Sequence, residues 1–200
     1  YFNTLNANTV TANVVTEAVG SPLTRANTQF GELRGRVVYP VGGDYFSTPN
    51  VVTTWPELDL RARATRNGGS YTFFVGKDQG VRAFQFYLIN NLLGLWYFDS
   101  AGVVHQTPNL GVGTPFAVNE LGWFRATLET TTGDIKFYYA DGNLEAPAIS
   151  DYTQLGATQN LGVNDIRVTT GPFFAGAYGP SPSTYPFDGD IYRSQVFNEI

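Results

Sequence analysis

The sequence ELDLRARA at residues 57–64 alternates strictly between charged and apolar side chains. Successive side chains of an extended chain point to opposite faces, so this pattern predicts a β-strand with one buried face. Leucine and alanine occupy the buried face, at the even positions. We expect the charged residues of the other face to be solvated and to pair with one another across strands. These residues are Glu57, Asp59, Arg61 and Arg63.

Similar alternation recurs along the chain and predicts about a dozen strands and no sizeable helix. The clearest examples are residues 71–75, 82–89, 92–98, 122–130, 135–139 and 187–197. The tripeptide NGG at 67–69 is typical of a hairpin turn, which would return strand 57–64 into strand 71–75. Strands with one buried face require a second sheet to cover that face. We therefore predict an all-β, antiparallel jelly-roll sandwich of two sheets.

The first 22 residues differ from the rest of the chain. ANTVT at 7–11 is nearly repeated as ANVVT at 12–16, and GSP at 20–22 is typical of a linker. Two such repeats cannot bury a core alone. The segment is either a flexible leader or a strand completed by other copies of the chain. We predict two parts: an extended N-terminal segment at 1–22 for oligomerisation or attachment, and the sandwich at 23–200.

The composition argues against several classes of partner. Twelve basic and 17 acidic residues give a net charge of −5, and no Lys/Arg cluster stands out. Binding to nucleic acid or to an anionic membrane surface needs such a cluster, so we expect neither partner. The chain contains no cysteine, which excludes disulfides and thiolate metal sites within it. No apolar run reaches 18 residues, so we expect no membrane insertion.

A set of short motifs, in a fixed order over about residues 57–200, resembles laminin G-like domains of tailed-bacteriophage structural proteins, within the concanavalin A-like jelly rolls. The motifs are LDLRAR (58–63), VGKD (75–78), RAFQF (82–86), LGLWY (93–97), WFRATL (123–128), GDIKFYY (133–139), DG (141–142), YTQLGA (152–157) and FDGDIYRSQV (187–196). This chain departs from the resemblance at residues 143–151, which lengthen a short turn and lack its tryptophan.

The resemblance implies a non-enzymatic structural protein on the virion surface, in a fibre, a tail or a capsid decoration. Its partners would be other copies of itself, with a trimer as the usual state, other virion proteins, and glycans of a host surface. The alternatives are a carbohydrate-binding module of a secreted or cell-surface protein and a laminarinase-type glycosidase. The fold alone does not distinguish these functions, because jelly-roll domains include binding, catalytic and structural proteins.

Catalytic signals are weak. Laminarinase-type glycosidases carry acidic residues on one strand face, and Glu57 and Asp59 match the first two of them. Arg61 and Ala62 stand where the third carboxylate should be, so the proton donor is missing. The chain has one histidine, His105, and no G-x-S-x-G motif that would support a Ser–His–Asp triad. We therefore expect His105 to be a hydrogen-bonded or exposed loop residue. We predict no catalytic residues.

The candidate ligand-binding residues are aromatic side chains in loop-like segments, since sugars stack their C–H faces on exposed rings. They are Trp55, Tyr178 and Tyr185. Trp96 and Trp123 lie within predicted strands, where we expect them to pack in the core or on a sheet face. Aspartates are frequent in turns, but none forms a D-x-D-x-D-G loop. We expect no metal site and no cofactor, with Ca²⁺ at the sandwich rim as the alternative raised by the resemblance.

Overall fold

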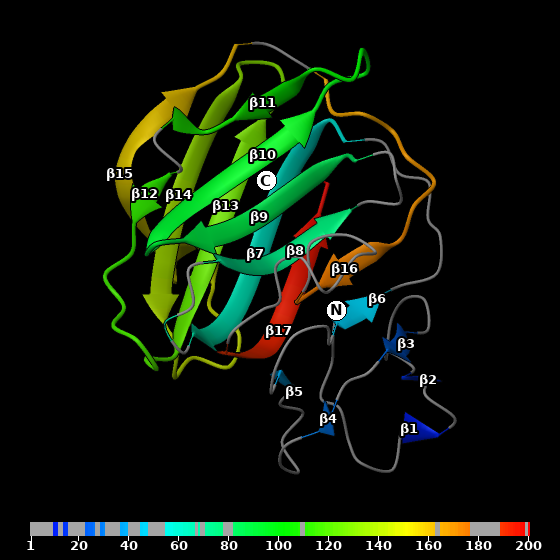
Figure 1. Cartoon of the computed structure of the whole chain (residues 1–200). Coiled ribbons are helices and arrows are strands. Elements are labelled where there is room, and N and C mark those ends of the chain that lie inside the picture. Colours follow the sequence, from blue (N-terminus) through cyan, green and yellow to red (C-terminus); the bar gives the residue numbers. More distant parts are fainter. Residues whose placement is uncertain are drawn as a thin grey trace.

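The computed structural model describes residues 55–66, 68, 71–77, 82–108, 111–162, 165–176, 189–198 and 200, and the backbone of six short strands between residues 10 and 47. Its strands form two sheets that lie one in front of the other (Figure 1). Every strand pairing in this part of the chain is antiparallel. The predicted all-β, two-sheet jelly-roll sandwich is confirmed.

The first sheet, sheet A, lies in front in Figure 1. In spatial order it contains β1 (Val10–Thr11), β2 (Val14–Val15), β3 (Leu23–Ala26), β6 (Tyr45–Ser47), β16 (Phe173–Ala175), β8 (Tyr71–Lys77), β9 (Phe84–Ile89), β10 (Leu92–Phe98) and β11 (Val104–Gln106). The short strand β12 (Val112–Gly113) also pairs with β10. Sheet A thus joins strands that lie far apart in the sequence.

The second sheet, sheet B, lies behind it. In spatial order it contains β15 (Thr153–Asn160), β14 (Asp134–Asp141), β13 (Gly122–Glu129), β7 (Glu57–Arg66), β17 (Gly189–Phe197), β5 (Val37–Tyr39) and β4 (Gln29–Phe30). A single 3₁₀ turn, η3 (Ile149–Asp151), is the helical element between β14 and β15. In the described part of the chain, no helix is long and apolar enough to cross a membrane.

The core fills the space between the two sheets. The apolar face of β7, predicted from the alternation at 57–64, is fully buried, with Leu58, Leu60, Ala62 and Ala64 all at 0% exposure. Aromatic rings meet it from sheet A, and Phe74 of β8 stacks on Phe124 of β13 with ring centres 4.9 Å apart. Burial of apolar surface on this scale is the main force that holds the sheets together.

The hairpin predicted at residues 67–69 is wrong. β7 pairs with β13 and β17 in sheet B, whereas β8 pairs with β9 and β16 in sheet A. The chain therefore crosses from one sheet to the other between these strands. The physical reason is the core: the apolar faces of β7 and β8 bury each other across the sandwich, which two neighbouring strands of one hairpin cannot do.

The solvated charged face predicted for β7 is also wrong. The Asp59 carboxylate is 0% exposed and accepts hydrogen bonds from two arginines. Arg61 approaches it to 2.6 Å, and Arg125 of the neighbouring strand donates two bonds of 2.9 and 3.0 Å. The Arg125 guanidinium also lies 4.8 Å from the centre of the Tyr138 ring. Asp59 does pair with an arginine of the neighbouring strand, as predicted, but its carboxylate is buried.

The segment at residues 142–152, which includes the lengthened turn at 143–151, contributes to this burial. The indole of Trp123 donates to the Leu144 carbonyl at 2.8 Å, and Arg63 donates to the Gly142 carbonyl at 2.8 Å. Tyr152 packs with Trp123, Ala140 and Tyr138 in a small hydrophobic cluster. Burial raises the pKa of the Tyr152 hydroxyl well above its usual range. The segment thus helps to close the outer face of sheet B.

We expect Asp59→Ala to lower the free energy of unfolding by about 3–5 kcal/mol, because it leaves two guanidinium groups without their shared counter-ion. Urea denaturation followed by tryptophan fluorescence measures this. Glu145→Ala is the control, since its side chain is 79% exposed and its ion pair with Arg63 is 4.0 Å long. Exposed pairs contribute at most about 1 kcal/mol. Equal effects of the two substitutions would contradict the structural role of Asp59.

Candidate functional site

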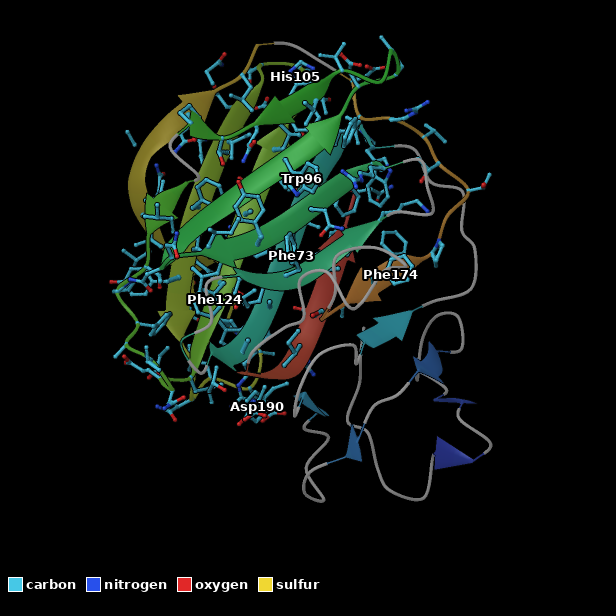
Figure 2. The ribbon with its side chains drawn as sticks, in the orientation of Figure 1. Phe73, Trp96, His105, Phe124, Phe174 and Asp190 are labelled. Carbon is cyan, nitrogen blue, oxygen red and sulfur yellow. The ribbon has the colours of Figure 1, made fainter. Side chains whose placement is uncertain are left out.

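The outer face of sheet A carries aromatic residues where a solvated sheet would carry polar ones. Phe73, Tyr87 and Ile89 form a second hydrophobic cluster there, separate from the core between the sheets, and are 4%, 1% and 7% exposed. Trp96 packs against this cluster and is itself partly exposed. Figure 2 shows Phe73 and Trp96 on neighbouring parts of this sheet. The face therefore combines a buried aromatic cluster with a partly exposed tryptophan.

One row of directly paired residues runs across this face, from β16 to β11. It contains Phe174, Gly76, Gln85, Trp96 and Gln106, each the cross-strand partner of the next. We call it the amide–aromatic row. Residues paired in register on one face have neighbouring side chains. The row thus places two side-chain amides on either side of a tryptophan, with a phenylalanine at one end.

Two glycines let large side chains lie flat on the sheet. A Cβ atom at Gly94 would stand 2.3 Å from the Tyr87 ring, and one at Gly76 would stand 2.6 Å from the Gln85 amide carbon. Real Cβ atoms do not approach other atoms this closely, so a larger residue at either position would force the facing side chain to shift. The Tyr87 ring therefore covers β10, and the Gln85 amide covers β8.

Hydrogen bonds and a cation orient the groups around Trp96. Gln106 donates to the Tyr87 hydroxyl at 3.2 Å, which joins β11 to β9 on this face. The Arg82 guanidinium lies 5.2 Å from the centre of the Trp96 ring, within the range of a cation–π contact. Phe98 follows along the same strand, with its ring 5.8 Å from that of Trp96. Together these groups can stack on an apolar ligand surface and hydrogen-bond its polar groups.

The structure places Trp55 in the core, not in an exposed position. Its side chain is 6% exposed, and it meets the rings of Phe84 and Phe173 edge to face at 5.1 and 5.8 Å. These contacts occupy the ring, so Trp55 packs the sandwich in place of the surface platform we expected. Tyr178 and Tyr185, the other two predicted ligand-binding residues, lie outside the described residues, and their role stays a prediction.

His105 is hydrogen-bonded, but it lies on strand β11 and not in a loop. Its Nε2 is 3.0 Å from Asp99 Oδ2, and its ring stacks on Tyr97 at 4.9 Å. The hydrogen bond from His105 lowers the pKa of the Asp99 carboxyl. This contact links β11 to the turn after β10, which is a structural role.

The described residues offer neither a metal-binding cluster nor an evident pair of acid–base groups. No group of three or more His, Asp or Glu side chains there could hold a metal ion. The Asp59 carboxylate is held by two arginines, and Glu57 accepts a bond from the backbone of Ile200. Lys77 is buried between the sheets, where burial lowers its pKa to about 8 and it donates to the Gly171 carbonyl. None of these groups faces the amide–aromatic row.

Sequence reasoning missed the outer face of sheet A, although a signal was present. In residues 84–89, the inward residues Phe84, Phe86 and Leu88 alternate with Gln85, Tyr87 and Ile89. The second face of this strand is therefore largely apolar and aromatic. The same holds for Trp96 and Phe98 in β10. Aromatic residues on both faces of neighbouring strands indicate that both faces are covered or bind something. Trp96 was predicted to pack in the core or on a sheet face, and the structure places it on the outer face of sheet A.

Comparisons with known proteins identify the fold and no family. No family model matches the chain, and no curated protein matches it either. Among solved structures, it is similar to the heptameric SAP-like pentraxin from Limulus polyphemus, with 10% identity and a TM-score of 0.57. The match covers 81% of this chain and 73% of the pentraxin chain.

Two further similar structures are binding domains of botulinum neurotoxins. The serotype D binding domain is 11% identical with a TM-score of 0.60, and the match covers 93% of this chain. The receptor-binding domain of the mosaic serotype C/D toxin is 8% identical with a TM-score of 0.56, and the match covers 88% of this chain. The chain spans 45% and 42% of these two toxin chains. At such low sequence identity, the similarity shows a shared jelly-roll fold. The function has to be inferred from the residues of the site.

We expect Gly94→Ala to lower the free energy of unfolding by about 1–3 kcal/mol, because the new methyl group displaces the packed Tyr87 ring. Gly113→Ala is the matched control on β12, where an added Cβ has no atom within 4 Å. The control should stay within about 0.5 kcal/mol of the parent. Thermal and urea denaturation of both variants measure the difference. An unchanged Gly94→Ala variant would show that Tyr87 does not lie flat on the sheet.

Proposed function

We propose that this protein is a non-enzymatic, lectin-like module that binds a glycan on the outer face of sheet A. The observation that carries this proposal is the amide–aromatic row, in which a partly exposed tryptophan lies between two side-chain amides. Sugars present apolar C–H faces and polar hydroxyl edges. A site for them needs a ring to stack on and a few fixed hydrogen-bonding groups beside it.

The position of the row on a rigid sheet supports this function. Trp96, Gln85 and Gln106 project from paired strands, so their spacing is set by the sheet register and not by a loop. Tyr87 is 1% exposed and receives the bond from Gln106, which holds that amide in place. Preorganised side chains lose little conformational entropy when a ligand binds. The fold shared with a pentraxin and with toxin binding domains is in keeping with such a role.

The glycosidase alternative has less support. A retaining mechanism needs two carboxyl groups, one of them a nucleophile that is free to attack. Asp59 is instead enclosed by Arg61 and Arg125 on the outer face of sheet B, and its side chain is 1% exposed. The groups that the structure shows around Trp96 are side-chain amides, aromatic rings and the Arg82 guanidinium. Binding is therefore the function that this geometry favours.

We expect Trp96→Ala to weaken glycan binding by at least about 30-fold, because the ring supplies the stacking surface. A glycan array first identifies a bound sugar, and calorimetry then compares the variants. Trp96→Phe should retain most of the affinity, since it keeps an aromatic face. Val118→Ala, at a side chain that is 47% exposed in the loop before β13, is the control for non-specific effects. Wild-type affinity in Trp96→Ala would place any glycan elsewhere on the molecule.

We further propose that several copies of this module are displayed on a virion, in a fibre, a tail or a capsid decoration. The support is the ordered resemblance of about residues 57–200 to laminin G-like domains of phage proteins, together with the position of the N-terminal strands. β1 stands at the edge of sheet A and pairs with β2 alone among the described strands. A sheet edge of this kind can be extended by a strand from another chain. A secreted or cell-surface carbohydrate-binding module remains the alternative.

Removal of residues 1–22 should convert a defined oligomer, with a trimer expected, into monomers. The physical reason is the loss of the edge strands β1 and β2, which would supply the intermolecular pairing. Multi-angle light scattering of the full chain and of the shortened chain measures the masses, with circular dichroism to verify that the sandwich stays folded. A full chain that is already monomeric would contradict assembly through this segment and would favour the secreted-module alternative.

A further inference from the structure

Four side chains form a compact square on β10 and β11, the last two strands of sheet A, which lie side by side in Figure 1. Trp96 pairs in register with Gln106, and Phe98 pairs with Val104. Alternate residues of a strand share a face, so all four side chains project from the outer face of the sheet. The rings of Trp96 and Phe98, with centres 5.8 Å apart, agree with this placement. We call these four residues the edge square.

The backbone hydrogen bonds bring the members of the edge square close together. Thr107 donates to the Leu95 carbonyl, and Asp99 donates to the Val103 carbonyl. Hydrogen-bonded pairs of an antiparallel ladder alternate with pairs that are not hydrogen-bonded, so both pairs of the edge square are of the second kind. In such pairs the Cα atoms are about 4.5 Å apart and the side chains lie closest. Two residues along a strand span about 7 Å, so the square has the size of one sugar ring.

Every member of the edge square reaches solvent in the structure as it stands. Val104 is 50% exposed, Gln106 is exposed, and Trp96 and Phe98 are partly exposed. Arg82 contacts the indole from the segment before β9, on the side of β10 away from β11. Trp96 keeps its exposure with this contact in place. A ligand can therefore touch the square without displacing any side chain.

Three of the four side chains are apolar or aromatic, and the fourth is an amide that the chain already orients. Gln106 donates to the Tyr87 hydroxyl at 3.2 Å, and its Oε1 atom, to which no described residue donates, is left for a ligand. The side chains of Val104 and Phe98 offer no hydrogen bond. A hydroxyl group placed over them would lose its bonds to water without a replacement, whereas a methyl group there would bury apolar surface. The square therefore matches a ligand with a hydroxyl at one end and a methyl group at the other.

We infer that the edge square binds 6-deoxyhexose residues, the sugars in which a methyl group replaces the hydroxymethyl group of an ordinary hexose. This inference rests on the proposed glycan-binding function and names its sugar class. The C–H face of the ring stacks on Trp96, and a ring hydroxyl hydrogen-bonds with Gln106. The methyl group lies against Val104 and Phe98, where an ordinary hexose would place its C6 hydroxyl.

The test compares two pairs of sugars that differ only at C6, L-fucose with L-galactose and L-rhamnose with L-mannose. Each sugar is displayed at equal density as a neoglycoconjugate, and biolayer interferometry measures its binding to the full chain. A methyl-sized difference in an apolar pocket changes affinity by about tenfold or more, and the edge square is partly exposed. We therefore expect at least one deoxy sugar to bind at least about fivefold more tightly than its hexose counterpart.

Substitutions at the apolar and polar corners of the square should have different effects. Val104→Thr keeps the shape of the side chain and replaces one methyl group with a hydroxyl, so the preference for the deoxy sugar should fall to about twofold or less. Val118→Thr, at a valine that is 47% exposed in the loop before β13, is the matched control and should leave the preference unchanged. Gln106→Leu should weaken binding of both members of a pair and leave their ratio unchanged. Circular dichroism verifies that each variant is folded.

The outcomes separate this inference from the proposed function. Equal binding within both pairs, an unchanged preference in Val104→Thr, or no binding of either deoxy sugar by a chain that binds other glycans would overturn the 6-deoxyhexose inference alone. A Val104→Thr variant with altered mass in light scattering and unaltered sugar binding would show that the square is a contact between copies of the chain. The glycan-binding function would stand in these cases as long as Trp96→Ala still lost affinity. A full chain that binds no glycan would overturn both.

Discussion

Burial of apolar side chains between the two sheets is the constraint on which the rest of this structure depends. Leu58 and Leu60 of sheet B face Phe74 and Phe86 of sheet A across a closed core. Because strand side chains alternate with a period of two, fixing the inward residues also fixes which residues point outward. The outer faces are then consequences of the core. Asp59 and Arg125 are directed to one of them, and Gln85 and Trp96 to the other.

The two outer faces have different properties. On sheet B, the charged residues are neutralised by one another, and the segment at 142–152 packs over them with Tyr152. That face is thus used for stability, and its arginines are engaged by Asp59 and by aromatic rings. On sheet A, the aromatic cluster around Tyr87 leaves Trp96 partly exposed and the Gln85 amide without a partner.

Strands were predictable from the sequence, whereas their partners were not. The expected strand at 92–98 coincides with β10, and those at 122–130 and 187–197 correspond to β13 and β17 with shifted ends. The turn at 67–69 was misinterpreted because glycine-rich turns occur both in hairpins and in crossings between sheets, with similar local sequence. Asp59 was expected in water because its alternation resembles that of a solvated strand, and the covering segment lies more than 80 residues away in the chain.

The sequence by itself determined the all-β class, the alternation of the strands and the inward residues of the clearest strands, because these depend on a local period of two and on side-chain polarity. Only the tertiary structure decided that Trp55 is buried, that Asp59 is shared by two arginines, and that Gln85 lies beside Trp96 on an aromatic face. Those properties depend on sheet order and register, which bring together residues from separate strands. Long-range pairing is set by the packing of the whole sandwich, so no local pattern could have shown it.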